Sequence, residues 1–160
     1  MSSLRARLDR ILFGALAGAV VLVAGDASID AQAPPGHYIV STDTALDTET
    51  GLVWQRGQVE IYKLGFADAL ARCQALSLGG FATGWRLPNI REMLSIVDER
   101  EPLGPMWDST VFVSTQGTSY WTATTVAGDT ANAWAFTFTP GVFMERVDKA
   151  TLTALVRCVH

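Results

Sequence analysis

The acidic residues Asp98, Glu99 and Glu101 stand close together in the sequence and could do chemistry. Their carboxylates could hold Ca²⁺, which takes several oxygen ligands. Two of them could also serve a glycosidase as acid and base, a role that needs a separation the sequence does not fix. A solvated acidic loop is the commoner origin of such a cluster. We therefore expect no cofactor, with Ca²⁺ at this loop as the alternative.

A nucleophilic site would need a serine, threonine or cysteine within hydrogen-bond reach of a base. The two histidines, His37 and His160, lie at the ends of the predicted domain, and neither Cys73 nor Cys158 has a histidine near it in the sequence. These patterns predict no enzymatic activity. The alternative is a small exported hydrolase that uses the acidic loop at 98–101.

The five tryptophans suggest carbohydrate binding, because sugar rings stack on aromatic faces. Trp107 lies in an irregular loop beside Asp108, so this pair is a candidate ligand contact. Asp129 and Asn132 belong to a polar turn that could also present hydrogen-bonding groups, although a plain hairpin is the commoner outcome. The other four tryptophans lie in predicted helix-flanking or strand segments and are expected in the core: Trp54, Trp85, Trp121 and Trp134.

Cys73 and Cys158 can form one intramolecular disulfide, and an even cysteine count in an exported chain favours it. The chain-entropy model gives such a long loop about 4–5 kcal/mol of stabilisation before native strain is subtracted. Two buried free thiols are the alternative. A metal site is less favoured, because the cysteines and histidines show no ligand spacing.

The first 33 residues have the pattern of a secretory signal and a short spacer. Three arginines precede an uncharged apolar stretch at 11–24, which is shorter than the about 20 residues of a membrane-spanning helix. An uncleaved anchor is the alternative, and cleavage after Gly25, Ala27 or Ala33 stays open. We predict a secreted, periplasmic or cell-surface protein that does not insert into the membrane after cleavage.

The net charge of the chain limits the classes of partner that it is expected to bind. The net charge is −4 and is the same without the first 33 residues, because Arg5, Arg7 and Arg10 are balanced by three aspartates. An acidic chain with scattered basic residues lacks the basic patch that nucleic acids, acidic lipids and polyanionic glycans require. We expect no nucleic-acid partner.

The elements that position these residues begin with short strands at 37–40 and 52–54, separated by a turn-rich segment at 43–51. Apolar residues at helical spacing predict a helix at 66–77 that ends at Gly79-Gly80. Asn89 and Glu92 form a capping box at the start of a second helix. Its apolar stripe is predicted to hold Ile90, Met93, Leu94 and Val97.

The second half of the chain is strand-like. Aromatic and β-branched residues predict strands at 120–125, 134–138, 142–144 and 155–159. Trp134, Phe136 and Phe138 alternate with smaller residues, which predicts one apolar face, and Pro140-Gly141 predicts a turn. The fold class is α+β, with two helices segregated from a twisted antiparallel sheet.

Seven motifs in order resemble one recurrent bacterial domain: TGLVWQ at 50–55, FADA at 66–69, LSLGG at 76–80, WRLPN at 85–89, YWTATT at 120–125, AW at 133–134 and VRCV at 156–159. The chain is similar to the DUF1566 family, also called the Lcl C-terminal domain after a Legionella collagen-like adhesin. This resemblance implies a C-type-lectin-like fold whose disulfide joins the first helix to the last strand. The adhesin binds glycosaminoglycan-type polysaccharides, but the present chain is acidic and lacks a collagen-like repeat.

These patterns predict one domain at 36–160 that works as a non-catalytic binding or adhesion-type module. Its expected ligand is a glycan or a cell-envelope protein. The alternatives are the exported hydrolase and a structural component of the envelope.

Overall fold

The computed structural model of the 160-residue chain describes residues 33–57, 62–98, 106–113, 118–138 and 143–160. The predicted signal up to residue 32, Glu99, Glu101 and the Pro140-Gly141 turn lie outside the described residues. The elements are, in order, β1 (Tyr38–Val40), β2 (Thr44–Asp47), β3 (Val53–Gln55), α1 (Phe66–Gln74), α2 (Ile90–Ser95), β4 (Ser119–Val126), β5 (Asp129–Thr137) and β6 (Phe143–Asp148). Within the described ranges, no helix is long and apolar enough to span a membrane.

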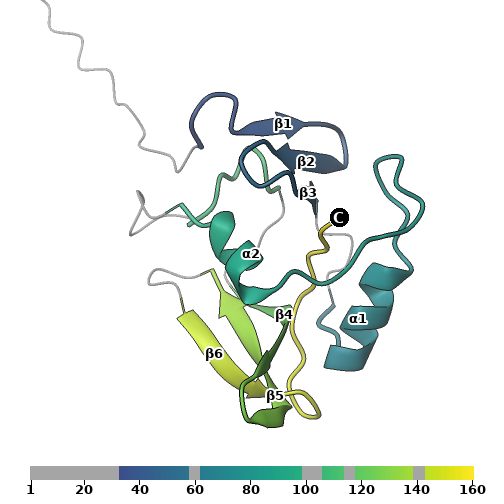
Figure 1. Ribbon diagram of the computed structural model, residues 1–160, viewed down its shortest axis with the longest axis vertical. Coiled ribbons are helices and arrows are strands. Elements are labelled where there is room, and N and C mark those ends of the chain that lie inside the picture. Colours follow the sequence, from purple (N-terminus) through teal and green to yellow (C-terminus); the bar gives the residue numbers. More distant parts are fainter. Residues whose placement is uncertain (1–32, 58–61, 99–105, 114–117, 139–142) are drawn as a thin grey trace, which may run out of the picture.

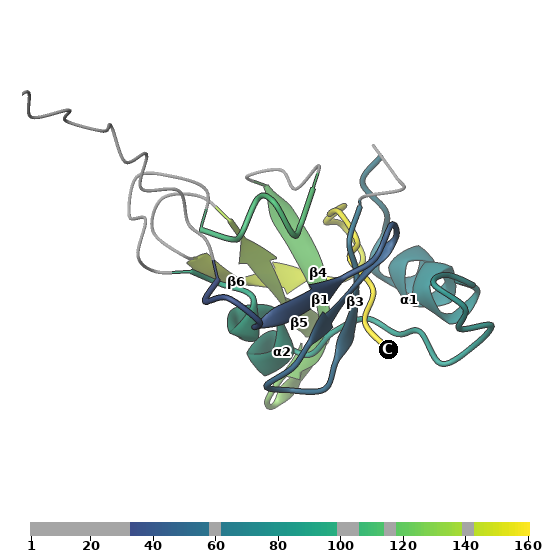
Figure 2. The same cartoon turned by 90° about the horizontal axis from the view of Figure 1, so that it is seen from above.

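The strands form two antiparallel three-stranded sheets, in the orders β1-β2-β3 and β4-β5-β6, so the prediction of one sheet is wrong. The α+β class is confirmed. In both views of the fold, the yellow C-terminal segment runs between α2 and α1 (Figures 1 and 2).

The C-terminal segment connects the two sheets and is not the regular strand predicted at 155–159. Val159 bridges to Trp54 of the first sheet, whereas Leu155 bridges to Tyr120 of the second. Because neighbouring residues pair with different segments, no continuous ladder forms. Figure 1 shows this yellow segment running from the end of the second sheet toward β3.

The segment predicted as turn-rich at 43–51 contains a strand. β2 pairs with β1 through Tyr38 and Asp47 and with β3 through Ala45 and Trp54. Ala45 is fully buried, so tertiary burial overrides the weak strand propensity of alanine and aspartate here.

The first helix ends earlier than predicted. α1 stops at Gln74, and its capping residue Ala75 donates its N–H to the carbonyl of Ala71. Gly79 and Gly80 instead turn the chain with φ of +60° and +86°, a conformation that suits glycine.

The predicted capping box of α2 is confirmed. The Asn89 side chain accepts hydrogen bonds from the backbone of Arg91 and Glu92, both at 2.9 Å, and the Glu92 carboxylate accepts the Asn89 N–H at 2.7 Å. The predicted apolar stripe is partly wrong, because Leu94 is exposed and Ile96 is buried. The helix ends at Ser95, so Ile96 no longer follows helical spacing.

The core consists of two hydrophobic clusters, and β5 is buried on both faces. Phe136 belongs to one cluster and Ala133 to the other, and successive residues Tyr120 and Trp121 divide in the same way. The predicted apolar face of β5 is buried at Phe136, but Trp134, also predicted in the core, is only half-buried. Because alternate side chains of a strand point to opposite faces, the burial of Ala133 and Ala135 shows that the other face is covered too.

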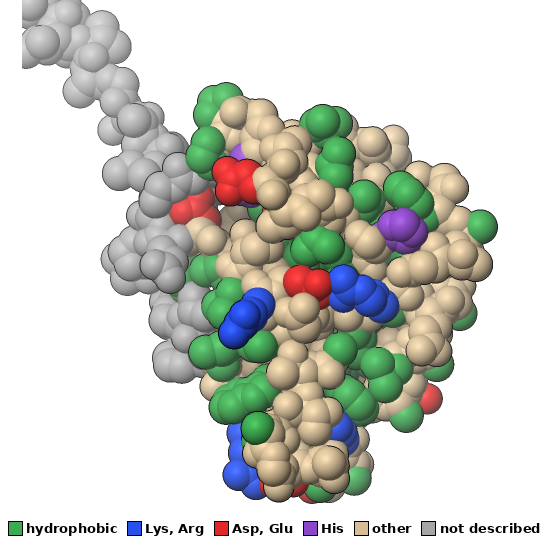
Figure 3. Space-filling view, viewed as in Figure 1, with side chains coloured by type: hydrophobic (Ala, Val, Ile, Leu, Met, Phe, Trp, Pro, Cys, Tyr) green, Lys and Arg blue, Asp and Glu red, His purple; other side chains and the backbone are tan. Residues whose placement is uncertain are grey.

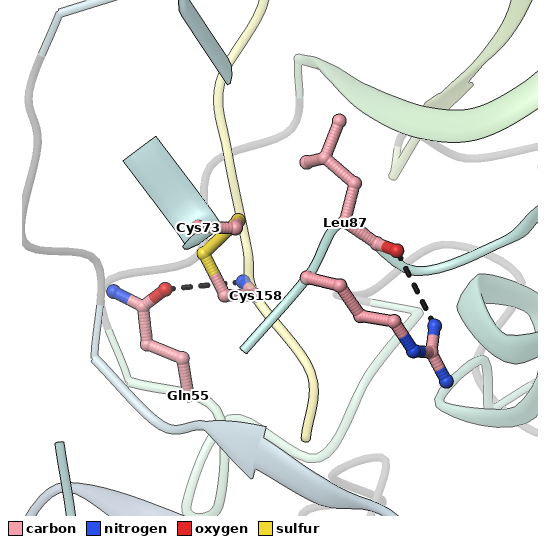
Figure 4. Close-up of a disulfide and its surroundings, with 5 residues drawn as sticks. Gln55, Cys73, Leu87 and Cys158 are labelled. Carbon is pink, nitrogen blue, oxygen red and sulfur yellow. Dashed lines mark hydrogen bonds between the residues drawn. A yellow bond between two sulfur atoms is a disulfide. The ribbon is translucent and has the colours of Figure 1, made fainter. Parts of the chain in front are cut away.

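The predicted disulfide between Cys73 and Cys158 is confirmed, and it ties α1 to the C-terminal segment. Both cysteines are buried in the second cluster. The Cys158 N–H donates to the side-chain oxygen of Gln55 at 3.1 Å, so the same segment is also fixed to β3 (Figure 4).

Candidate functional site

Three segments far apart in the sequence enclose a groove beside β1, which we call the N-terminal groove. It has two adjoining hollows with volumes of about 360 and 300 Å³. Both hollows are lined by Ala33, Pro34, Tyr38 and Asp108. The end of α2, at 95–98, completes one hollow, and residues 110–111 complete the other.

Tyr38 of β1 lies at the junction of the two hollows. Its ring packs edge to face against Phe112, with centroids 5.3 Å apart. Burial raises the pKa of the Tyr38 phenol, and the nearby carboxylates, led by Asp47 and Asp108, raise it further. The phenol therefore stays neutral and can donate a hydrogen bond at physiological pH.

Asp108 is buried and builds one wall of the groove. One carboxylate oxygen accepts the backbone N–H of Thr110 at 2.9 Å and its hydroxyl at 2.6 Å, while the other accepts the N–H of Ala33 at 2.9 Å. The first set of bonds closes a turn in the manner typical of aspartate. The bond to Ala33 joins the two ends of the groove wall across a separation of 75 residues.

His37 lines one hollow of the groove and lies between two carboxylates. Its Nε2 is 3.6 Å from Asp47, and its Nδ1 is 3.2 Å from Glu49. Asp47 is fully buried, and its Oδ1 accepts the N–H groups of Glu49 and Thr50. Its Oδ2 has no hydrogen-bond partner among the described residues, so this buried carboxylate is incompletely satisfied.

The groove is acidic. Asp98 and Asp108 line it, and no lysine or arginine is among its described lining residues. Figure 3 shows acidic side chains near the start of β1, whereas the basic side chains on this face lie lower. The local charge therefore opposes binding of an anionic group.

Trp107, predicted from the sequence as a ligand contact, is 8% exposed. Its ring packs edge to face on Phe138, with centroids 5.3 Å apart, and it belongs to the first core cluster. Little of the indole remains for stacking on a ligand. Its neighbour Asp108 does line the groove, so the structure separates the roles of the two residues.

Asp129 and Asn132 lie at the hairpin between β4 and β5, away from the N-terminal groove (Figure 1). One carboxylate oxygen of Asp129 accepts hydrogen bonds from the side chains of Asn132, at 2.8 Å, and Arg146. These bonds fix the hairpin. The structure therefore does not bring this pair together with Trp107 and Asp108.

Of the acidic loop, Asp98 alone is described, and it lies at the rim of the groove. Its backbone N–H donates to the carbonyl of Met106 at 3.0 Å. Glu99 and Glu101 lie outside the described residues. In the part of the chain that the structure describes, no group of three potential ligands is arranged to hold a metal ion.

Arg157 is a buried charged residue that the sequence analysis did not predict. Its guanidinium donates to the carbonyls of Gln55 and Arg56 at 2.6 and 2.8 Å and lies over the Phe112 ring at 5.2 Å. Burial lowers the pKa of Arg157. It supports the far side of Phe112, which in turn packs on Tyr38.

The sequence also did not predict the groove residues Tyr38 and His37 or the buried carboxylate of Asp47 beside them, because each occurs in an ordinary strand or turn context. The spacing of Asp108 and Thr110 is a turn signature and could have revealed the structural role of Asp108. The sequence holds no local signal that α2 would close over residues 33–38.

Comparison with known proteins identifies a family for most of the chain. A family model described as the Lcl C-terminal domain matches residues 43–160. No curated protein and no solved structure gives a match.

Proposed function

Because this chain belongs to the Lcl C-terminal domain family, we propose that it is an exported, non-catalytic binding module with a C-type-lectin-like fold. The disulfide between Cys73 and Cys158 supports export, because such bonds persist in oxidising compartments. The signal pattern of the first 33 residues points in the same direction.

The observation that carries the binding function is the N-terminal groove. It combines an aromatic ring at Tyr38, apolar surface at Pro34 and Ile96, and carboxylates at Asp98 and Asp108. Small-ligand and peptide sites typically combine mostly apolar walls with a few polar groups. The ligand is a glycan or a cell-envelope protein, and the acidic lining favours a neutral or cationic one over a polyanion.

The experiment compares the exported protein cleaved after Gly25 or Ala27, which keeps the groove residue Ala33, with a variant of it whose groove is blocked. Ser95→Trp places a large ring at the rim of the groove, and Ser77→Trp places the same ring at an exposed position outside it. Binding is measured on a glycan array and with fractionated envelope components. We expect Ser95→Trp to lose the binding that wild type and Ser77→Trp share. Equal binding by all three proteins would reject the groove as the site.

The alternative hydrolase function has its own test. Turnover of a glycoside or ester that is abolished by Glu99→Gln and Glu101→Gln in a folded protein would replace the binding function with catalysis. Unchanged hydrolysis in these variants would show that the activity does not come from the acidic loop.

A further inference from the structure

We propose that the N-terminal groove binds a lysine or arginine side chain carried by an extended segment of a partner protein. This inference rests on the binding function proposed above and names its ligand class. Two features of the groove support it, namely the sign of its charge and the arrangement of its apolar walls, and one of the nearby carboxylates is in addition incompletely satisfied.

The charge comes from four carboxylates. Asp98 and Asp108 line the groove, and Asp47 and Glu49 lie close enough to Tyr38 to act on its phenol. The guanidinium of Arg56 approaches the same wall, where it donates to the neutral carbonyls of Thr110 and Val111 at 3.0 Å each and so keeps its positive charge. His37 lies between Asp47 and Glu49. Among the described residues, the four carboxylates therefore outnumber the Arg56 guanidinium beside the groove, and this excess of negative charge attracts a cation.

The apolar walls suit a long cationic side chain better than a bare inorganic cation. Pro34, Ile96 and Val97 provide aliphatic surface, and Tyr38 provides an aromatic ring. Lysine and arginine bury their methylene stems on such surface while the charged head seeks carboxylates. An ammonium or guanidinium near an aromatic face gains a further cation–π attraction.

Asp47 is the incompletely satisfied carboxylate. It is paired with Tyr38 across β1 and β2, it is fully buried, and its Oδ2 has no hydrogen-bond partner among the described residues. A buried carboxylate with an unpaired oxygen is costly. A cation held beside Tyr38 would offset part of this cost through space, which favours the charged ligand over a neutral one.

The shape of the groove favours a segment of chain. The two hollows meet at Tyr38 and Asp108 and are both open to solvent, so an extended peptide can pass from one to the other. A neutral glycan is the competing occupant, but its binding is not strengthened by charge attraction to the carboxylates.

The test uses a short peptide of alternating alanine and lysine, blocked at both ends, titrated into the mature protein. The control peptide is identical except that its lysines are acetylated and hence uncharged. We expect the lysine peptide to bind at least about tenfold more tightly, and this advantage to shrink as salt is raised. Equal affinity for the two peptides, or no binding by the lysine peptide, would overturn the inference.

Charge-removing variants locate the binding. Asp98→Asn should lower the affinity for the lysine peptide about fivefold, as expected for the loss of one partly exposed ion pair. Glu49→Gln, at an exposed position, is a second variant in case Asp98→Asn perturbs folding, and we expect it to weaken binding about twofold. Asp68→Asn on α1 removes the same charge away from the groove and should leave affinity unchanged. Equal effects of Asp98→Asn and Asp68→Asn would contradict the inference.

A neutral oligosaccharide separates this inference from the proposed function. If it binds wild type but not Ser95→Trp, while the lysine peptide does not bind, the groove is a binding site and the cationic ligand is wrong. If neither probe binds and the blocked variant loses no envelope ligand, the proposed function fails as well.

Discussion

Tyr38 and Asp47 are cross-strand partners in β1 and β2, so a groove-lining phenol stands beside a fully buried carboxylate. One oxygen of this carboxylate has no hydrogen-bond partner among the described residues. Its other oxygen closes the turn that leads from β2 to β3. Asp47 thus links the stability of the first sheet to the electrostatics of the groove.

Replacing Asp47 should separate these two roles. Asp47→Ala removes the acceptor for the N–H groups of Glu49 and Thr50 and should lower the free energy of unfolding by about 1–3 kcal/mol. Asp47→Asn keeps an acceptor oxygen and removes the charge, so it should lower the free energy of unfolding clearly less than Asp47→Ala does. Urea unfolding of both variants measures the difference. Equal losses would mean that the charge, not the acceptor, stabilises the turn.

Loss of the disulfide should destabilise the domain strongly. The bond closes a separation of 85 residues, and removing such a bond costs about 2–5 kcal/mol. Cys73→Ala with Cys158→Ala should therefore melt well below wild type, and reductant should lower the melting temperature of wild type alone. Alkylation of the native protein followed by intact-mass analysis is the direct check. Two alkylated thiols without denaturant would contradict the bond.

The capping box predicts that the stability of the domain falls at acid pH. Burial by itself raises the pKa of Glu92, but the hydrogen bonds from Arg86 and the Asn89 backbone outweigh it, so the net pKa lies below the ordinary value of 4.5. A lowered pKa in the folded state adds stability above the ordinary value, and this contribution disappears as pH falls through the folded value.

Glu92→Gln tests this dependence because the amide does not titrate. Wild type should be more stable than Glu92→Gln at neutral pH, and the difference should close as the pH falls below 4.5. Urea unfolding at several pH values measures it. A difference that stays constant down to strongly acid pH would show that the carboxylate charge contributes nothing.

Gly79 should tolerate alanine poorly. At φ of +60°, a Cβ at this position would lie 2.4 Å from the Thr44 methyl group. Gly51→Ala is the matched control, since its φ is +75° and its Cβ would meet nothing within 4 Å. The free energy of unfolding of the control should fall by about 1–2 kcal/mol, because alanine is strained in the left-handed backbone conformation. That of Gly79→Ala should fall further, because the steric contact is added. Adding Thr44→Ala should recover part of the extra loss, and no recovery would contradict the steric explanation.

The features that the sequence predicts well are local or covalent. The capping box of Asn89 and Glu92 depends on two residues three positions apart, and the disulfide follows from a single pair of cysteines in a chain predicted to be exported. Both are confirmed. The helix and strand types were recovered wherever hydrophobic spacing was regular, as in α1 and β4.

The groove could not be predicted, because it depends on contacts between distant segments. Asp108 contacts Ala33 across 75 residues, and the end of α2 lines the same hollow. Trp107 illustrates the same limit. Its irregular sequence context suggested exposure, but tertiary packing on Phe138 buries it.

The role of the N-terminal groove is tested most directly by determining the structure of the mature protein with the alternating alanine–lysine peptide bound. We predict a lysine ammonium within hydrogen-bond distance of Asp98 or Asp108, with its methylene stem along Tyr38. A peptide seated elsewhere, for example at the Asp129 and Asn132 hairpin with the groove empty, would contradict the account.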